Sequence, residues 1–576
     1  MNLFETYRTL VLTAVEAVLP GYKTDAITLE PPREASHGDL STNAAMVLAG
    51  QAKQKPRDVA EKIAEHLRNV HDVVSVEVAG PGFINIRLAP SAWQKVVPFI
   101  IDSGNSYGNS RIGAGQKINV EYVSANPTGP MHVGHARGAV YGDALATLLM
   151  KAGYNVTKEY YINDAGAQVE KVARSAYLRY REACGEEIGE IPEGLYPGEY
   201  MKAAGAVIRE AFGEKLMHVP EEEWLPQCKS IALDAMMALI KQDLADLGIT
   251  HDVFTSEAAL LKAGKIEKAI EVLRGHDLIY RGVLEPPKGK KLDDWEPREQ
   301  LLLRSTVYGD DTDRAVQKSD GSYAYIAGDL ALAVDKLSRG FDHQILVLGA
   351  DHGGYIKRLQ AAVKALSGGT ADCHVIICQL VHLFQNGEPF KMSKRAGTFI
   401  TVRDVIDAVG KDILRFVMLM RKSDMVMDFD LAKVKEQSKD NPVFYVQYAH
   451  ARAKSVLRLA REQMPDAYKL SEKGADITLL THEAELTLIK LLGGWPRLVE
   501  QAAVAHEPHR IIYYLEQLAA AFHGLWNVGS KDAEIRMVQP EQPAITAARL
   551  ALARALAVVV ASGLTVCGVE PLEELR

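Results

Sequence analysis

Cysteine is scarce in this chain of 576 residues. There are five cysteines, at positions 184, 228, 373, 378 and 567, and no two of them form a Cys-x-x-Cys pair. An odd number at these spacings excludes a dense disulfide scaffold and argues against a structural zinc site. We therefore expect reduced, mostly buried thiols in a cytosolic protein.

Long apolar runs are also missing. The most apolar stretch, residues 555–569, falls short of the ~20 residues that a membrane-spanning helix needs. It is also interrupted by Ser562, Gly563 and Gly568. The N-terminal residues carry charge from Glu5 onward and contain no apolar signal core. We expect a buried helix at 555–569, no membrane partner and a cytoplasmic location.

An excess of basic charge is absent too, since the formal net charge is −8. This excludes a protein whose whole surface is basic, but a local basic stripe could still contact phosphates. Apolar residues make up 47% of the chain and charged residues 24%, which is typical of globular proteins. At roughly 150 residues per domain, the length predicts three or four domains.

The middle of the chain has the pattern of an α/β protein. Residues 118–123 read as a strand and residues 132–152 as a helix, and the apolar run at 344–348 is typical of a strand buried on both faces. Strand–loop–helix repeats predict a doubly wound, Rossmann-like parallel sheet. We assign this domain to residues 109–432, with a charged helical insertion at about 165–300.

The two ends of the chain differ from the middle. Residues 1–108 combine an amphipathic opening helix with two alternating runs at 73–78 and 83–88, which predict a strand pair in an α+β domain. Residues 433–576 are rich in Ala, Leu, Glu and Arg with few turn residues, which predicts an all-α bundle.

A histidine turn at residues 131–135 carries the first chemical signal. His132 and His135 are three apart, so they share a face of the first turn of the predicted helix, whose N-terminus attracts anions. Gly134 between them leaves room for a base or ribose against the backbone. Two histidines alone more often form an ordinary surface or core pair, but the preceding Pro-Thr-Gly-Pro turn favours phosphate binding.

A lysine motif at residues 391–395 carries the second signal. Lys391 and Lys394 flank Met392 and Ser393 in what reads as a loop. Two ammonium groups suit the charge that develops on a leaving pyrophosphate. Most Lys-x-x-Lys-Arg strings are solvated basic loops, and only the pairing with the histidine turn favours the functional interpretation.

Together the two motifs resemble the signatures of the class I aminoacyl-tRNA synthetases, a His-x-Gly-His turn and a Lys-Met-Ser-Lys loop. The resemblance covers nearly the whole chain and points to the arginyl-tRNA synthetase family. The strings that carry it lie at residues 37–43, 121–138, 162–166, 325–329, 412–415 and 445–452. The first is similar to that family's N-terminal domain, and the last resembles the opening of its anticodon-binding bundle.

This resemblance implies an ATP-dependent ligase that joins L-arginine to its cognate tRNA through an arginyl-adenylate. ATP would be bound by His132, Gly134, His135, Lys391, Met392, Ser393 and Lys394. Of these, the two histidines and the two lysines would be catalytic. Mg²⁺ should accompany ATP through its phosphates, and activation should require the tRNA.

An arginine site follows from the same resemblance. A guanidinium is a planar fork of five donors and demands a carboxylate. Tyr325 and Asp329 are four apart and would face it together on a helix; a helix with a surface Asp is the less favoured alternative. Ser124, Asn126 and His135 would hold the amino-acid end, and the resemblance also places Glu121 in the arginine site. His352 occupies the place of a glutamine in eukaryotic members, and its role is open.

Contacts to tRNA are predicted in both end domains. Phe83 and Asn85 resemble residues that read an unpaired base, but an ordinary strand fits equally well. Lys454 and Arg458 belong to a basic stripe that could follow phosphates or simply be solvated. Trp526 could stack on an anticodon base, although core packing is the better interpretation. Three linked domains can span a tRNA, so we expect a monomer.

Two other functions fit parts of this pattern. One is a synthetase-like RNA-binding protein without catalysis, which would normally have lost one of the two motifs. The other is a class I synthetase for another amino acid, such as cysteine or glutamine. The cysteine enzyme would need a zinc-binding Cys/His set, which the sequence does not offer.

Overall fold

The computed structural model describes residues 1–284, 298–389, 400–436 and 441–574. The chain divides into two compact units. One contains Met1–Ile112, Gln437–Val566 and Glu570–Arg576, and the other contains Gly113–Glu436 and Cys567–Val569. Each unit is described separately below.

The second unit is built on a five-stranded parallel sheet in the order β12-β11-β5-β6-β7. The strands are β5 (Lys117–Tyr122), β6 (Asn155–Ile162), β7 (Val253–Ser256), β11 (His343–Gly349) and β12 (Asp372–Cys378). The chain moves from β5 to β6 on one side, whereas β11 pairs with β5 on the other. This arrangement confirms the predicted Rossmann-like sheet, and its switch point lies beyond the carboxyl ends of β5 and β11, where such sheets bind ligands.

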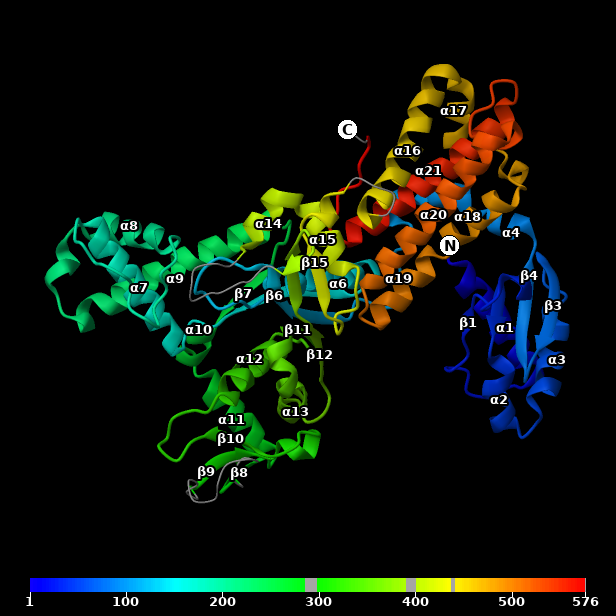
Figure 1. Ribbon diagram of the computed structural model, residues 1–576. Coiled ribbons are helices and arrows are strands. Elements are labelled where there is room, and N and C mark those ends of the chain that lie inside the picture. Colours follow the sequence, from blue (N-terminus) through cyan, green and yellow to red (C-terminus); the bar gives the residue numbers. More distant parts are fainter. Residues whose placement is uncertain (285–297, 390–399, 437–440, 575–576) are drawn as a thin grey trace. The chain divides into compact units, whose positions relative to one another are not determined.

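The described part of this unit also contains ten helices and two small sheets (Figure 1). The helices are α6 (Val133–Lys151), α7 (Ala167–Ala183), α8 (Met201–Phe212), α9 (Glu221–Asp246), α10 (Glu257–Lys262), α11 (Lys265–Gly275), α12 (Ile326–Ser338), α13 (Ile356–Leu366), α14 (Val402–Val409) and α15 (Lys411–Leu419). One small sheet contains β8 (Ile279–Gly282), β9 (Gln300–Leu303) and β10 (Arg314–Gln317); the other contains β13 (Val381–Gln385), β14 (Glu388–Pro389) and β15 (Met427–Asp430).

The helical insertion predicted at about 165–300 does not fill that whole range. Its first part, α7 to α9, forms a separate helical core in which the rings of Tyr177 and Trp224 stack at 3.7 Å. However, β7 lies inside this range and is the edge strand of the central sheet. The four residues of β7 are only half-buried, so the sequence offered no apolar run to mark the strand.

A buried cluster of charged side chains holds α6 in place. Arg415 of α15 is fully buried and donates to the Asp143 carboxylate and to the carbonyls of Leu247 and Cys567. Burial alone would raise the pKa of Asp143, but Arg415 and Lys158 outweigh it and hold that pKa below its usual value. The helix that begins at the histidine turn is therefore fixed by charge as well as by packing.

The first unit holds an antiparallel sheet and a helical bundle. The sheet has the order β1-β2-β4-β3, with β1 (Leu29–Glu30), β2 (Leu40–Thr42), β3 (Val73–Ala79) and β4 (Phe83–Leu88). The pairing of β3 with β4 confirms the predicted strand pair. The N-terminal part of this unit also contains the helices α1 (Leu3–Val18), α2 (Ala44–Ala52), α3 (Pro56–Leu67), α4 (Pro90–Gln94) and α5 (Val96–Ser103).

The bundle is all-helical, as predicted. It contains α16 (Pro442–Gln463), α17 (Pro465–Glu472), α18 (Glu483–Gly493), α19 (Trp495–Val504), α20 (His509–Lys531) and α21 (Pro543–Val566). Among the described residues, α21 is the one helix long and apolar enough to cross a membrane, and 72% of its apolar window is buried inside the protein. Such burial is what a core helix of a bundle requires.

Candidate active site

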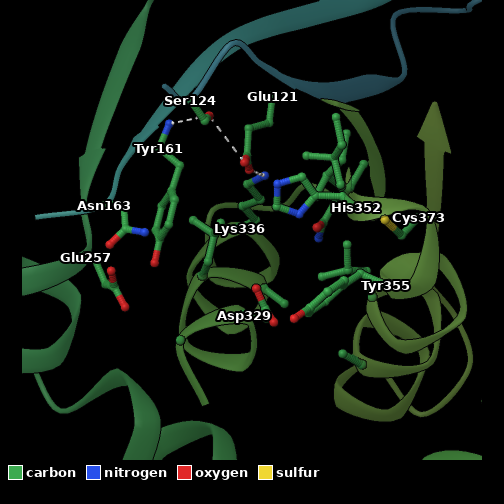
Figure 2. A pocket seen from close by; sticks show the side chains of 18 of the residues that line it. Glu121, Ser124, Tyr161, Asn163, Glu257, Asp329, Lys336, His352, Tyr355 and Cys373 are labelled. Atoms are coloured by element: carbon green, nitrogen blue, oxygen red, sulfur yellow. Dashed lines mark hydrogen bonds and ion pairs between the residues drawn. The ribbon is translucent and has the colours of Figure 1, made fainter. Parts of the chain in front are cut away.

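A cavity of about 430 Å³ opens beyond the carboxyl ends of β5 and β11 (Figure 2). Its walls come from β5, β6, α12, α13 and the turn after β11. Six residues predicted to bind arginine line this one cavity: Glu121, Ser124, Asn126, Tyr325, Asp329 and His352. They come from sequence positions more than 200 residues apart and meet at the switch point of the sheet.

The end of β5 delivers two of these side chains through a strained turn. Val123 and Ser124 have φ angles of 70° and 41°, a left-handed conformation that costs energy for a β-branched valine. The Ser124 hydroxyl accepts from the Tyr161 amide at 3.0 Å and lies 3.5 Å from the Glu121 carboxylate. The turn therefore directs a serine and a carboxylate into the same wall.

Glu121 already has a cation. The ammonium of Lys336 forms an ion pair with it, and both side chains are almost fully buried. Lys336 was not predicted from the sequence. A signal existed, because Asp329, Leu332, Ala333 and Lys336 follow the i, i+3, i+4, i+7 spacing of one helix face, and all four line the cavity.

Asp329 and Glu257 are two carboxylates of the cavity that lack a close cation among the described residues. In the described part of the chain, neither carboxylate has a Lys or Arg within ion-pair distance. Burial raises the pKa of Asp329 to about 7, with further contributions from Glu121 and Glu257 that outweigh the opposing effect of Arg358. Burial also raises the pKa of Glu257. Two carboxylates with raised pKa values in one cavity favour a cationic ligand, which would stabilise their ionised forms.

Glu257 was also absent from the prediction. It is the first residue of α10, directly after the Ser256 cap, and Figure 2 draws it beside Tyr161 and Asn163. Its sequence surroundings carry no motif, and only the return of β7 to the sheet brings it to the cavity.

Two further residues predicted to bind arginine stand nearer the opening. Tyr325 is 92% exposed and immediately precedes α12. The His352 imidazole is half-exposed, lies 3.6 Å from the Asp351 carboxylate and packs edge-on against Tyr355. Both can reach a ligand that enters the cavity.

The histidine turn starts α6 as an unusual cap. His132 is the N-cap residue, and its Nδ1 accepts from the Gly134 amide at 3.1 Å. Nδ1 of His135 accepts in turn from the His132 amide at 3.3 Å, and the two rings stack at 3.7 Å. Because each Nδ1 accepts, a neutral ring carries its proton on Nε2, where it can be donated to an anion.

Gly134 has a steric role in this cap. A Cβ at this position would lie 2.9 Å from the His132 ring, so any side chain would displace the imidazole. The small residue thus permits the pair of rings as well as any close approach by a nucleotide.

The histidine turn is bonded through its backbone to the segment that follows the lysine motif. Lys391, Met392, Ser393 and Lys394 lie outside the described residues. The segment that follows them is described: the Val402 amide donates to the Met131 carbonyl at 2.8 Å, and the Val133 amide donates to the Ile400 carbonyl at 3.3 Å. An antiparallel bridge pairs His132 with Thr401 between them. The chain that leaves the lysine motif is therefore bonded to the histidine turn.

The residues predicted to contact tRNA in the N-terminal domain differ in exposure. Phe83 is 40% exposed, whereas Asn85 is buried and its side-chain carbonyl accepts from the Ser41 hydroxyl at 2.7 Å. Phe83 could stack on a base as it stands. Asn85 would have to become exposed to read a base.

The predicted residues of the bundle are similarly engaged. Lys454 forms an ion pair with Glu573 at 2.9 Å, and Arg458 contacts Glu574 at 3.4 Å. Trp526 is half-buried, with the Arg452 guanidinium 4.8 Å from its ring centre. The C-terminal acidic residues thus cover part of the basic stripe.

The described residues include no group of three or more His, Cys, Asp or Glu side chains that could hold a metal ion. All five cysteines are free thiols. Burial raises the pKa of Cys228, Cys373, Cys378 and Cys567 to about 12, so these four are neutral at physiological pH.

Comparisons with known proteins agree along the whole chain. Residues 5–88 match the family model of the arginyl-tRNA synthetase N-terminal domain, residues 96–192 match the class I (R) tRNA synthetase catalytic domain, and residues 446–575 match the DALR anticodon binding domain.

Full-length relatives are similar at high identity. The chain is 57% identical over 585 residues to an arginine–tRNA ligase of Parvibaculum lavamentivorans, and 56% identical over 582 residues to one of Roseobacter denitrificans. Both alignments cover 100% of each chain. The solved Thermus thermophilus arginyl-tRNA synthetase shares the fold over 100% of both chains, with a TM-score of 0.74 at 20% identity. The chain belongs to the arginyl-tRNA synthetase family of class I aminoacyl-tRNA synthetases.

Proposed function

We propose that this cavity and the adjoining histidine turn carry out the family's reaction, the ATP-dependent attachment of L-arginine to its cognate tRNA through an arginyl-adenylate. The observation that carries the proposal is the pair Asp329 and Glu257. Two carboxylates without a cation, in a cavity that begins a few residues from the histidine turn, offer a guanidinium what it needs.

In this proposal the guanidinium of arginine binds Asp329 and Glu257, with Tyr325 and His352 closing the wall around it. The α-amino and carboxylate end lies toward Glu121, Ser124, Asn126 and His135. Lys336 neutralises Glu121, so the amino-acid end does not compete with the guanidinium for the same charge.

ATP binds across the histidine turn. Nε2 of His132 and of His135 donate to phosphate oxygens, and the nucleoside packs near Gly134. Lys391 and Lys394, with Met392 and Ser393 between them, neutralise the β- and γ-phosphates. The tie between residues 400–402 and residues 131–133 supports a shared nucleotide. Mg²⁺ arrives with ATP and is held mainly through its phosphates, and no zinc is required.

The reaction proceeds in two transfers. A carboxylate oxygen of arginine attacks the α-phosphorus of ATP in line, and pyrophosphate leaves with the bonding electron pair. A hydroxyl of the terminal ribose of the tRNA then attacks the activated carbonyl, loses its proton, and releases AMP. Positioning and charge stabilisation suffice, so no covalent enzyme intermediate is needed.

We further propose that residues 1–108 and 433–576 serve as tRNA-contacting domains and that residues 109–432 form the catalytic domain. Phe83 with Asn85, Lys454 with Arg458, and Trp526 are the proposed contacts. The enzyme acts as a cytoplasmic monomer without a membrane partner.

The proposal is tested by charging total tRNA with each of the twenty amino acids in turn. Arginine alone should be esterified, and arginine-dependent exchange of pyrophosphate into ATP should depend on added tRNA. Charging with another amino acid at a comparable rate, or no charging at all with intact binding of RNA, would contradict it.

A further inference from the structure

Helix α9 links the helical core of α7–α9 to the histidine turn. Its 26 residues span about 39 Å at the rise of an α-helix. Trp224 and Cys228 near its start are buried in the α7–α9 core, while its other end lies beside α14 (Figure 1). Neither signature motif lies on α9, so its last turn has no role in the mechanism above.

The first contact of this last turn is with the backbone before the histidines. Asp243 is 6% exposed, and its Oδ2 accepts from the Met131 amide at 2.8 Å. Met131 is fully buried and directly precedes His132. Its carbonyl accepts from Val402 at 2.8 Å, so both polar groups of the Met131 backbone are bound, one by α9 and one by the segment after the lysine motif.

The second contact is with that segment itself. Asp246 forms an ion pair with Arg403, and its Oδ1 accepts from Gln242 at 2.9 Å. Asp243 and Asp246 are three residues apart and therefore share one face of α9. One helix turn thus holds residue 131 with one aspartate and residue 403 with the other.

A neutral acceptor or a water would satisfy the Met131 amide at lower cost than a buried carboxylate, whose removal from water is penalised. Burial accordingly raises the pKa of Asp243. The carboxylate forms a short, directional hydrogen bond with the Met131 amide. Because Met131 directly precedes His132, this bond also fixes the position of His132. Displacement of a reacting group by 1 Å can cost about 100-fold in rate.

We infer that Asp243 and Asp246 are positioning residues for adenylate formation, and that they hold the histidine turn and the segment after the lysine motif in mutual register. The inference rests on the proposed role of the histidine turn. The role of the last turn of α9 is separate from arginine binding, because neither aspartate lines the cavity beyond β5 and β11.

The test compares Asp243→Ala, Asp243→Asn and Asp246→Ala with the wild type in pyrophosphate exchange with tRNA present. Asp243→Ala should lower kcat about 10- to 100-fold, and Asp243→Asn, which keeps an acceptor oxygen, should recover most of the loss. The dissociation constant for arginine, from titration calorimetry on folded enzyme, should change less than twofold. Asp234→Ala removes an exposed aspartate of the same helix and should behave as wild type.

The ion pair is tested by a double-mutant cycle. Asp246→Ala and Arg403→Ala should each lower kcat, and the double variant should be no worse than either single variant. Additive losses would overturn the role of the pair. Wild-type kcat in Asp243→Ala, or a fall in kcat and arginine binding in proportion to unfolded protein, would overturn the inference.

A variant of the turn itself separates this inference from the proposed function. His132→Ala should abolish exchange. If it does so while Asp243→Ala and Asp246→Ala keep wild-type turnover, the positioning role of α9 is wrong and the site stands. If His132→Ala exchanges at the wild-type rate, the proposed site fails, and the inference fails with it.

Discussion

Below about pH 7, arginine binding should require Asp329 to lose a proton, because the carboxyl of the free enzyme is largely protonated there. Burial raises the pKa of Asp329 to about 7, Glu121 and Glu257 add to the shift, and Arg358 opposes it. A guanidinium stays charged throughout this range and pairs only with the ionised carboxylate. Binding therefore shifts this carboxyl toward the ionised form and releases a proton at low pH.

The size of the effect follows from the fraction of ionised Asp329. With a pKa of about 7, roughly 3% of the free enzyme is ionised at pH 5.5 and about half at pH 7. The apparent affinity scales with the binding-competent fraction, so arginine should bind about 16-fold more weakly at pH 5.5 than at pH 7. The α-amino group of arginine remains protonated between pH 5.5 and pH 7, so it adds nothing to the pH dependence of arginine binding.

Titration calorimetry in buffers of different ionisation enthalpy measures both quantities. Asp329 alone should account for close to one proton released per arginine at pH 5.5 and about half a proton at pH 7. Asp329→Asn should bind weakly with little pH dependence. His352→Gln, which removes an imidazole from the same wall, should keep the slope. Equal affinity at the two pH values, or an unchanged slope in Asp329→Asn, would refute the reasoning.

Three further predictions concern the cavity, the ion cluster and the lysine motif. Glu257→Gln should raise KM for arginine and narrow the preference for arginine over lysine, as measured by charging kinetics with both amino acids. Arg415→Ala should destabilise the catalytic unit by roughly 3 kcal/mol in urea unfolding, because it breaks a buried pair, whereas the exposed Arg421→Ala should change little. Lys394→Ala should slow adenylate formation about 10²–10³-fold with arginine affinity unchanged, and a wild-type rate in single-turnover assays would contradict the role of that ammonium.

Periodicity predicted the elements of the catalytic sheet that are buried on both faces. The strands now seen as β5 and β11 have four or more consecutive buried positions, and such runs are visible in a sequence. Strand β7 has none, since all four of its residues are half-buried. Its place at the sheet edge is fixed by pairing with β6, a long-range contact that leaves no local pattern.

The histidine turn was found from residue types, but its geometry was not. The spacing of His132 and His135 predicted two side chains on one helix face. The structure adds that each Nδ1 accepts a backbone amide, which directs the protons of neutral rings to Nε2. Histidine is not a usual capping residue, and propensity alone would have favoured Ser, Thr, Asp or Asn at that place.

Which carboxylates of the cavity are paired with a cation is the feature that is hardest to predict from the sequence. Glu121, Asp329 and Glu257 are all carboxylates, yet Lys336 neutralises the first and leaves the other two to a ligand. Asp329 and Glu257 lie close enough for one to raise the pKa of the other. A guanidinium presents five donors in a fork and can engage both, whereas the compact ammonium of lysine leaves one carboxylate without a partner. A buried unpaired charge costs several kcal/mol, so in the proposed site selectivity should arise from the penalty imposed on the wrong amino acid as much as from the bonds offered to the right one.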